Sequence, residues 1–356
     1  MFMRRWSGGL AVALLALAVL GRVVPAARAQ QFVNGGPHDG DGAYGDGGRA
    51  YDPGSGLFVR RMSARAAANA IHERFGPRAA PFALPGAPRK ARPGITPVAG
   101  NGAGPLGGGW TIWSTSELGF LRDKRPAKAS RGHSVSFTLG LDRRLSERFT
   151  AGVSVNAVHA RLKTFFKGGH TRNTSVTISP YINYAFTDWL SLDATGGYVY
   201  SAERLTRSIP GFATGRTHAN GYTFSAALDA SRWLDRWLLS GRAGIIVSHD
   251  DWRAYTESDG TFVAARTDKL TQGVLEASAS LWLDPLMPYA TVAYSRDLAS
   301  SDPPGSDRDD WTLTSGIAYY GSGRFDGLTA DLSASIILGR RKQRNATFAF
   351  GLRWTF

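Results

Sequence analysis

The stretch NATFAFGLRWTF, residues 345–356, places five large apolar side chains on alternate positions. They are Phe348, Phe350, Leu352, Trp354 and Phe356, with small or polar residues between them. Because successive side chains of a strand point to opposite faces, one face of this strand is wholly apolar. The lipid-facing wall of a membrane barrel has this pattern, with polar side chains turned to the lumen. The half-buried sheet of a soluble protein also alternates, so further features must separate the two classes.

The amino terminus predicts export through a signal peptide, residues 1–29. Arg4 and Arg5 precede an apolar run, residues 10–20, and the small-residue site Ala27-Arg28-Ala29 follows. This is the layout of a secretory signal peptide, and the run is too short for a bilayer core of about 30 Å. No later stretch has the length of apolar sequence that a spanning helix needs. A mature chain in the membrane must therefore cross it as strands.

Twelve alternating runs between residues 110 and 356 predict an all-β fold, a transmembrane antiparallel β-barrel of about 12 strands. The runs begin near Trp110, His133, Phe149, Thr174, Trp189, Gly221, Trp237, Gln272, Pro288, Trp311, Leu328 and Asn345. Short links at residues 143–148, 187–188, 234–236, 284–287 and 321–327 alternate with mostly longer polar links at 122–132, 163–173, 202–220, 248–271, 299–310 and 339–344. Outer-membrane barrels have an even strand number, short periplasmic turns and longer outer loops. We therefore predict a barrel in the Gram-negative outer membrane with both of its ends in the periplasm.

Residues 30–109 differ from the barrel in composition. They begin Gly- and Asp-rich and end Pro- and Gly-rich, which predicts a flexible segment. Strong helix formers in residues 60–75 predict one short helix within it. At about 1.5 Å per residue, such a helix could thread the lumen of the barrel.

The formal net charge of +14 is concentrated partly in two predicted outer loops. The basic residues are Arg122, Lys124, Arg125, Lys128 and Arg131 in one loop, and Arg340, Arg341, Lys342 and Arg344 in the other. Such clusters attract lipid phosphates, so contacts with lipopolysaccharide are one interpretation and a merely solvated loop is the other. Outer-membrane lipid is the expected surrounding, and nucleic acid is not an expected partner of an exported barrel.

The predicted inner face carries the charges that we expect to matter for function. They are Glu117, Asp142, Asp193, Asp229, Arg242, Glu276, Asp331 and Arg353. Pairing between these groups would set the conductance and selectivity of a lumen, or would simply brace the inner wall. The sequence indicates no cofactor and no metal ion.

His249-Asp250-Asp251 is the best candidate for catalysis, which needs a His within hydrogen-bond reach of a carboxylate. His249 and Asp251 share a face of the strand, but Asp250 points to the opposite one. His133 and Ser134 diverge in the same way. We expect the chain not to be an enzyme.

The run of residues 133–201, with LGLDRRLSERFTAGVSV and ISPYINYAFTDWLSLDATGGYVY, and the terminal FAFGLRWTF resemble the translocator domain of autotransporters, the type V secretion proteins. The resemblance covers residues 110–356. It implies a barrel that carries an upstream passenger to the surface, with a linker helix in the pore. It also implies periplasmic chaperones and the barrel-assembly machinery as partners, and a terminal assembly signal formed by Phe350, Leu352, Trp354 and Phe356. The predicted function is to anchor or translocate the short amino-terminal segment; the alternatives are a passive pore for small solutes, or a surface enzyme or adhesin that acts through its outer loops.

Overall fold

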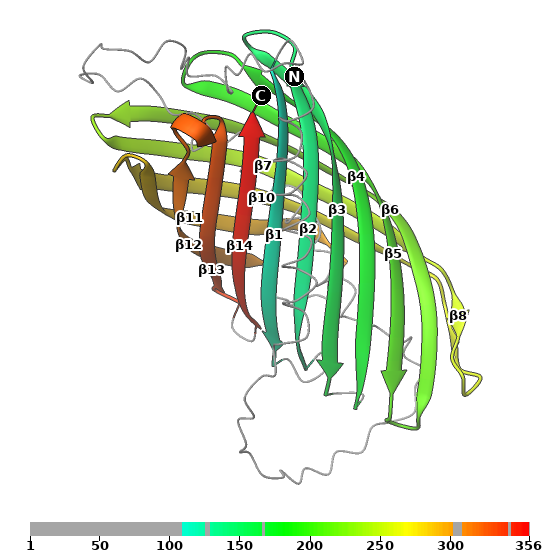
Figure 1. The fold of residues 1–356 in the computed structure, drawn as a ribbon. Helices are drawn as coiled ribbons and strands as arrows, with labels where there is room; N and C mark the ends of the chain where they lie inside the picture. The colour runs from blue at the N-terminus through cyan, green and yellow to red at the C-terminus, as the bar shows by residue number, and fades with distance from the viewer. Residues whose placement is uncertain (1–108, 125–128, 166–167, 302–307, 341–342, 356) are drawn as a thin grey trace. The chain divides into compact units, whose positions relative to one another are not determined.

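The computed structural model describes residues 109–124, 129–165, 168–301, 308–340 and 343–355, all within the unit Ala50–Phe356. Twelve strands close into one antiparallel barrel in the order β1-β14-β13-β12-β11-β10-β7-β6-β5-β4-β3-β2 (Figure 1). The barrel strands are β1 Trp110–Asp123, β2 Ser130–Arg144, β3 Phe149–Thr164, β4 Gly169–Ala185, β5 Leu190–Arg207, β6 Ala213–Leu234, β7 Trp237–Trp252, β10 Arg266–Leu281, β11 Leu286–Ser300, β12 Asp309–Tyr320, β13 Leu328–Leu338 and β14 Gln343–Thr355. Two further short strands, β8 Tyr255–Thr256 and β9 Phe262–Val263, form a separate sheet. The prediction of a twelve-stranded antiparallel barrel is confirmed.

The barrel closes where the first strand meets the last. β1 pairs with β14 without a break from Thr111 opposite Thr355 to Asp123 opposite Gln343. On its other side β1 pairs with β2, from Trp110 opposite Arg143. Closure gives every strand two hydrogen-bonded neighbours, as a sheet in hydrocarbon requires.

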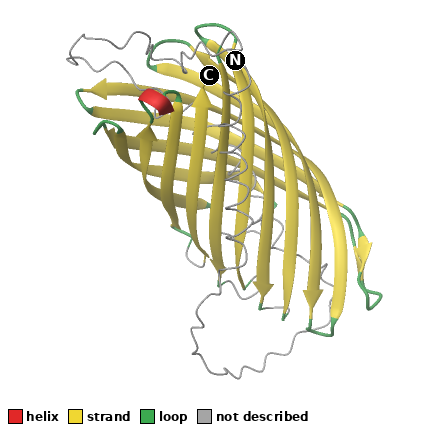
Figure 2. Ribbon diagram, in the orientation of Figure 1, coloured by secondary structure: helices red, strands yellow, loops and turns green. Residues whose placement is uncertain are grey.

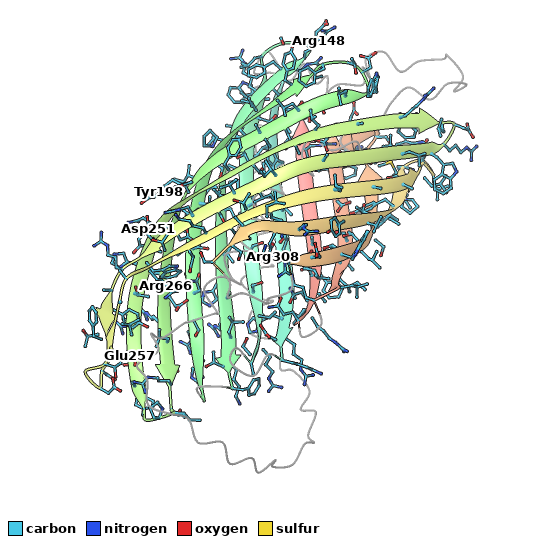
Figure 3. All side chains as sticks on the ribbon, turned by 180° about the vertical axis from the view of Figure 1, so that it is seen from behind. Arg148, Tyr198, Asp251, Glu257, Arg266 and Arg308 are labelled. Atoms are coloured by element: carbon cyan, nitrogen blue, oxygen red, sulfur yellow. The ribbon has the colours of Figure 1, made fainter. Side chains whose placement is uncertain are left out.

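The two ends of the barrel differ in the links that join the strands. The links at residues 145–148, 186–189, 235–236, 282–285 and 321–327 lie at one end, which we call the periplasmic end by the general rule for such barrels. The other end, the outer end, has a long link between β7 and β10 that carries the small hairpin β8–β9. Figure 3 labels Arg148 at the periplasmic end and Glu257 at the outer end.

All six outer links are shorter than predicted, and two of them illustrate the difference. We expected loops at residues 163–173 and 202–220, but the structure leaves only residues 165–168 and 208–212 outside strands. β6 accordingly extends over 22 residues, and its side chains alternate between buried and more exposed positions from Ala213 onward. Figure 2 shows the barrel strands as long continuous ribbons. We expected loops because these segments are polar. They form strands because their side chains still alternate between the inward and the outward face.

The two faces of the sheet differ as a membrane barrel requires. On β4, Val176 and Ile178 are exposed, while Thr177 and Ser179 between them are buried. Polar inner positions and apolar outer positions recur around the barrel. Within the described ranges, no helix is long and apolar enough to cross a membrane. The predicted signal peptide, the segment 30–109 and its short helix lie outside the described residues, and their boundaries stay predictions.

A buried chain of hydrogen bonds ties three strands together inside the barrel. The Trp113 indole on β1 donates to the Tyr181 hydroxyl on β4 at 2.7 Å. That hydroxyl donates to Asp142 on β2 at 2.9 Å. Gly140 is the β2 residue directly opposite Trp113, and a Cβ atom there would lie 2.2 Å from the indole ring. The missing side chain of Gly140 therefore makes room for this chain.

We expect Gly140→Ala to displace the Trp113 ring and to lower the free energy of unfolding by about 1–3 kcal/mol, as overpacking does. Urea unfolding of the protein in detergent micelles, followed by tryptophan fluorescence, measures this change. Gly196→Ala is the matched control, since a Cβ atom there meets no described atom within 4 Å. Equal unfolding midpoints for the two variants would refute the claim that Gly140 makes room for the Trp113 ring.

Candidate functional site

The inner wall of the barrel is the candidate functional site. All eight predicted inner-face residues occupy strand positions of the buried parity: Glu117, Asp142, Asp193, Asp229, Arg242, Glu276, Asp331 and Arg353. Their part in transport or in bracing the wall stays a prediction. The contacts below show which of them the fold brings together.

Arg242 on β7 joins two carboxylates on the part of the wall nearer the periplasmic end. Its guanidinium lies 3.1 Å from Asp193 on β5 and 3.8 Å from Asp229 on β6. All three side chains are at most 10 % exposed. Glu276 on β10 is the direct cross-strand neighbour of Arg242 on the other side. One cation therefore stands among three acids that come from different strands.

Other predicted residues are bound to neutral partners on the wall. Asp331 accepts a hydrogen bond from the Tyr289 hydroxyl at 3.0 Å. Arg353 donates to the Thr329 hydroxyl at 2.9 Å. These contacts hold the charged side chains against the sheet. The inner wall is therefore polar at these positions and presents hydrogen-bonding groups, rather than an apolar surface, to the interior.

Arg340 forms a buried cluster at the outer end. Its guanidinium contacts Asp310 on β12 at 2.9 Å and Asp297 on β11 at 3.1 Å, and Gln272 donates to Asp297 at 2.8 Å. Arg340 lies in the link after β13, and although burial acts to lower its pKa, the two carboxylates raise that pKa above its ordinary value. We predicted Arg340 as a lipopolysaccharide contact. The structure corrects this, because its guanidinium is buried and already paired.

A second cluster attaches the hairpin β8–β9 to the barrel. Arg207 at the end of β5 contacts Glu257 at 2.7 Å and Asp259 at 2.5 Å. Asp259 also accepts the Thr261 backbone N–H, and this hydrogen bond, with the charge of Arg207, holds the pKa of Asp259 below its ordinary value. The contact between Arg207 and Asp259 is therefore present at neutral pH and is lost as the pH falls through that lowered pKa.

Arg207, Glu257, Asp259, Asp297 and Asp310 were not among the predicted site residues. Four of them lie in segments that we expected to be outer loops. For Arg207, Asp297 and Asp310, buried parity within the strands was the only signal in the sequence, and the pairing of distant strands could not be inferred from it. Glu257 and Asp259 lie in the turn between β8 and β9, where no strand parity applies.

The other predicted surface residues lie at the outer end where they are described. Arg122, Lys124 and Arg344 are exposed there, while Arg125, Lys128, Arg341 and Lys342 lie outside the described residues. In the predicted assembly signal, Phe350 and Trp354 face outward on β14, Leu352 is half-buried, and Phe356 lies outside the described residues.

The catalytic candidate forms a compact outward cluster. His249 Nε2 lies 3.1 Å from Asp251, and Thr267 donates to the same carboxylate at 2.7 Å. The imidazole stacks on Tyr222 with ring centroids 4.9 Å apart. Asp250 is buried on the opposite face, as its parity requires. In the part of the chain that the structure describes, no group of three or more acidic or His side chains is placed to hold a metal ion.

Residues 112–316 match the family described as "Autotransporter beta-domain". The chain belongs to this family. The predicted resemblance to autotransporter translocators is thus confirmed, and the protein is an outer-membrane translocator barrel of the Gram-negative type.

Solved structures agree in fold. The translocator domain of the autotransporter NalP from Neisseria meningitidis has a TM-score of 0.59 at 15 % identity, covering 70 % of this chain and 89 % of that one. The β-domain of the Bordetella autotransporter BrkA has a TM-score of 0.60 at 18 % identity, covering 69 % and 99 %. The transport unit of AIDA-I from Escherichia coli has a TM-score of 0.51 at 13 % identity, covering 86 % and 100 %. A comparison with curated protein sequences finds no match.

We expect Arg242→Leu to lower the free energy of unfolding of this translocator by about 3 kcal/mol, because it leaves buried carboxylates without their cation. Urea unfolding in micelles measures the loss. Adding Asp193→Asn and Asp229→Asn to Arg242→Leu removes the uncompensated charges and should restore most of the lost stability. A triple variant no more stable than the single one would show that charge is not the cause.

We expect Arg207→Gln to free the hairpin β8–β9 from the barrel. Hydrogen exchange followed by mass spectrometry should show faster exchange in residues 255–263, where the Glu257 and Gly260 amides are hydrogen-bonded within the hairpin. Arg308→Gln, which removes an exposed cation from a neighbouring outer link, is the control and should leave the exchange unchanged. Wild-type protein should lose the contact between Arg207 and Asp259, and show part of this loosening, in acid below the ordinary aspartate pKa of about 3.9.

Proposed function

We propose that this translocator barrel carries residues 30–109, the segment that precedes β1, across the outer membrane and holds it at the cell surface. Membership of the autotransporter β-domain family carries the proposal. Whatever the segment does at the surface depends on its own sequence, whereas the barrel supplies passage and attachment.

The place where the chain enters the barrel supports this function. β1 begins at Trp110, at the end that also holds the short links and the last residue of β14, Thr355. The segment before β1 is therefore joined to the barrel at the periplasmic end. A polypeptide that starts there and reaches the surface has to pass the polar inner wall.

The inner wall suits an unfolded chain that passes through. Small polar side chains such as Thr177 and Ser179 face inward along β4, and inward charges are paired, as for Arg242 with Asp193. A moving polypeptide meets water and weak hydrogen bonds there rather than an apolar surface that would retain it. The outward-facing side chains meanwhile keep the barrel in lipid.

We also propose the partners and the absence of catalysis. The outward aromatic side chains of β14, Phe350 and Trp354, are the part of the barrel that the barrel-assembly machinery would read, after periplasmic chaperones have delivered the chain. His249 and Asp251 are not assigned a reaction, because they lie on the outward face, where the imidazole stacks on Tyr222 and the Asp251 carboxylate accepts a hydrogen bond from Thr267.

The surface position of the segment can be tested with a site for a sequence-specific protease inserted after Gly48. We expect protease added to intact cells to cut there, because translocation places residue 48 outside. The same site inserted after Gly260 in the hairpin is the accessible control, and a site after Ser322 in a periplasmic link is the protected control. Cleavage after Gly48 only in lysed cells would exclude translocation and leave a passive pore as the better account.

A further inference from the structure

Four arginines meet directly across neighbouring strands on the outward face of the outer end. The pairs are Arg161 with Arg172, Arg172 with Arg204, and Arg204 with Arg216, on β3 to β6. All four side chains are exposed. We call this set the arginine row.

A second row continues around the barrel. Arg122 on β1 lies opposite Arg344 on β14 and Arg131 on β2, and Arg131 lies opposite Lys163 on β3. These four side chains are also exposed. Together the two rows form a basic belt of eight residues over seven adjacent strands: Arg344, Arg122, Arg131, Arg161, Lys163, Arg172, Arg204 and Arg216.

The belt has no acidic counterpart on its own face. On β14 and on β1 to β6, no described residue of the outward parity is Asp or Glu. On the other half of the barrel, the outward cations are balanced: Arg296 lies 3.8 Å from Asp309. Like charges directly opposite each other destabilise a sheet. An unbalanced row of them indicates a face that meets an anionic partner.

The height of the belt matches the surface of the outer leaflet. On β4, Arg172 lies twelve residues from Tyr184, and the outward positions between them are apolar except for Thr174. Twelve residues at about 3.3 Å span about 40 Å along the strand, or about 30 Å along the membrane normal for a tilt of about 40°. The apolar band of such barrels is about 25 Å tall, so Arg172 lies just beyond it when Tyr184 marks the lower edge.

Tyrosine side chains on the outward face of β5 lie below the belt. Tyr198 and Tyr200 point outward, six and four residues from Arg204, and Tyr198 donates a hydrogen bond to Asn220 at 2.8 Å. Figure 3 labels Tyr198 between the periplasmic end and the outer end. Tyr198 pairs with Ile178, midway between Arg172 and Tyr184, so it lies within the apolar band and the belt lies about 15 Å above it along the membrane normal. The height assigned to the belt therefore rests on the length of the apolar run on β4.

The side chains of the belt suit phosphate. Seven of the eight are arginine, whose planar guanidinium binds phosphate with two parallel hydrogen bonds. Arg161 is oriented by a hydrogen bond to His159 at 3.1 Å, and His159 is hydrogen-bonded to Thr174 at 2.9 Å. The cations of Arg131 and Lys163 both lie within 5.7 Å of the Phe165 ring.

We propose that the basic belt binds the phosphate groups of lipid A, the membrane anchor of lipopolysaccharide. The assignment rests on the orientation given above for the translocator, with the long link and hairpin outside. It differs from the loop clusters predicted from the sequence, because it excludes the buried Arg340 and centres on strand residues of β2 to β6. Neighbouring arginines then share phosphates that cancel their mutual repulsion.

Native mass spectrometry of the full mature chain in detergent, titrated with bisphosphorylated lipid A, tests the proposal. The belt variant carries Arg161→Gln, Arg172→Gln, Arg204→Gln and Arg216→Gln. It should bind at least about ten-fold more weakly, because hydrogen bonds to charged groups are strong. The control removes four exposed arginines at the periplasmic end, with Arg148→Gln, Arg232→Gln, Arg236→Gln and Arg324→Gln, and should bind as the wild type does. Unchanged binding by the belt variant would overturn the proposal.

Two further probes decide which chemistry is recognised. Dephosphorylated lipid A should bind about as weakly to the wild type as intact lipid A binds to the belt variant. If phosphatidylglycerol binds as tightly as lipid A, and its binding is lost equally in the belt variant, the assignment to lipopolysaccharide is overturned.

The single variant Arg204→Gln, expected to bind lipid A a few-fold more weakly, serves if the fourfold variant does not fold. The protease site after Gly48 tests translocation independently of lipid A binding. Translocation can be absent while lipid A still binds, and lipid A binding can be absent while the site after Gly48 is still cleaved on intact cells.

Discussion

Backbone hydrogen bonding between β1 and β14 is the constraint on which the rest of the molecule depends. In hydrocarbon, each unpaired backbone group costs several kcal/mol, so a sheet with two open edges is not a solution. The thirteen residue pairs from Thr111 with Thr355 to Asp123 with Gln343 remove both edges at once. Closure also fixes the inside and the outside. Every side chain of the twelve strands is then assigned to lipid or to the lumen by its parity alone.

That assignment decides which charges the barrel tolerates and how it holds them. Inward charges lie among other polar groups and pair across several strands, as Arg242 does with Asp193 and Asp229. At the outer end the same principle anchors chain segments outside the barrel wall: Arg207 holds the hairpin β8–β9, and Arg340 holds the link between β13 and β14. In the hydrocarbon region, an outward charge would have no polar groups around it. On the described strands, outward charges therefore occur only toward the two ends.

Strand number, face assignment and family could be predicted from the sequence because each rests on a local period of two. The inner-face parity of Arg242 and Asp193 followed from the same period. The outer ends of the strands could not be predicted in this way. Segments 163–173 and 202–220 are polar, and polar composition is what a solvated loop also has. Arg340 shows the other limit, since four basic residues close together in sequence indicate an exposed cluster, and only contact with Asp297 and Asp310 buries one of them.

Extending those strands changes what their basic residues mean. As loop residues, Arg172 and Arg204 would be independent solvated charges; as opposite residues on β4 and β5, they are held side by side at a fixed height. The belt also crosses the seam of the barrel, where Arg122 on β1 faces Arg344 on β14. Repulsion there opposes the closure that the fold requires, whereas a phosphate shared by both guanidinium groups supports it. The lipid headgroups of the outer leaflet thus belong to the same balance of forces as the hydrogen bonds of the sheet.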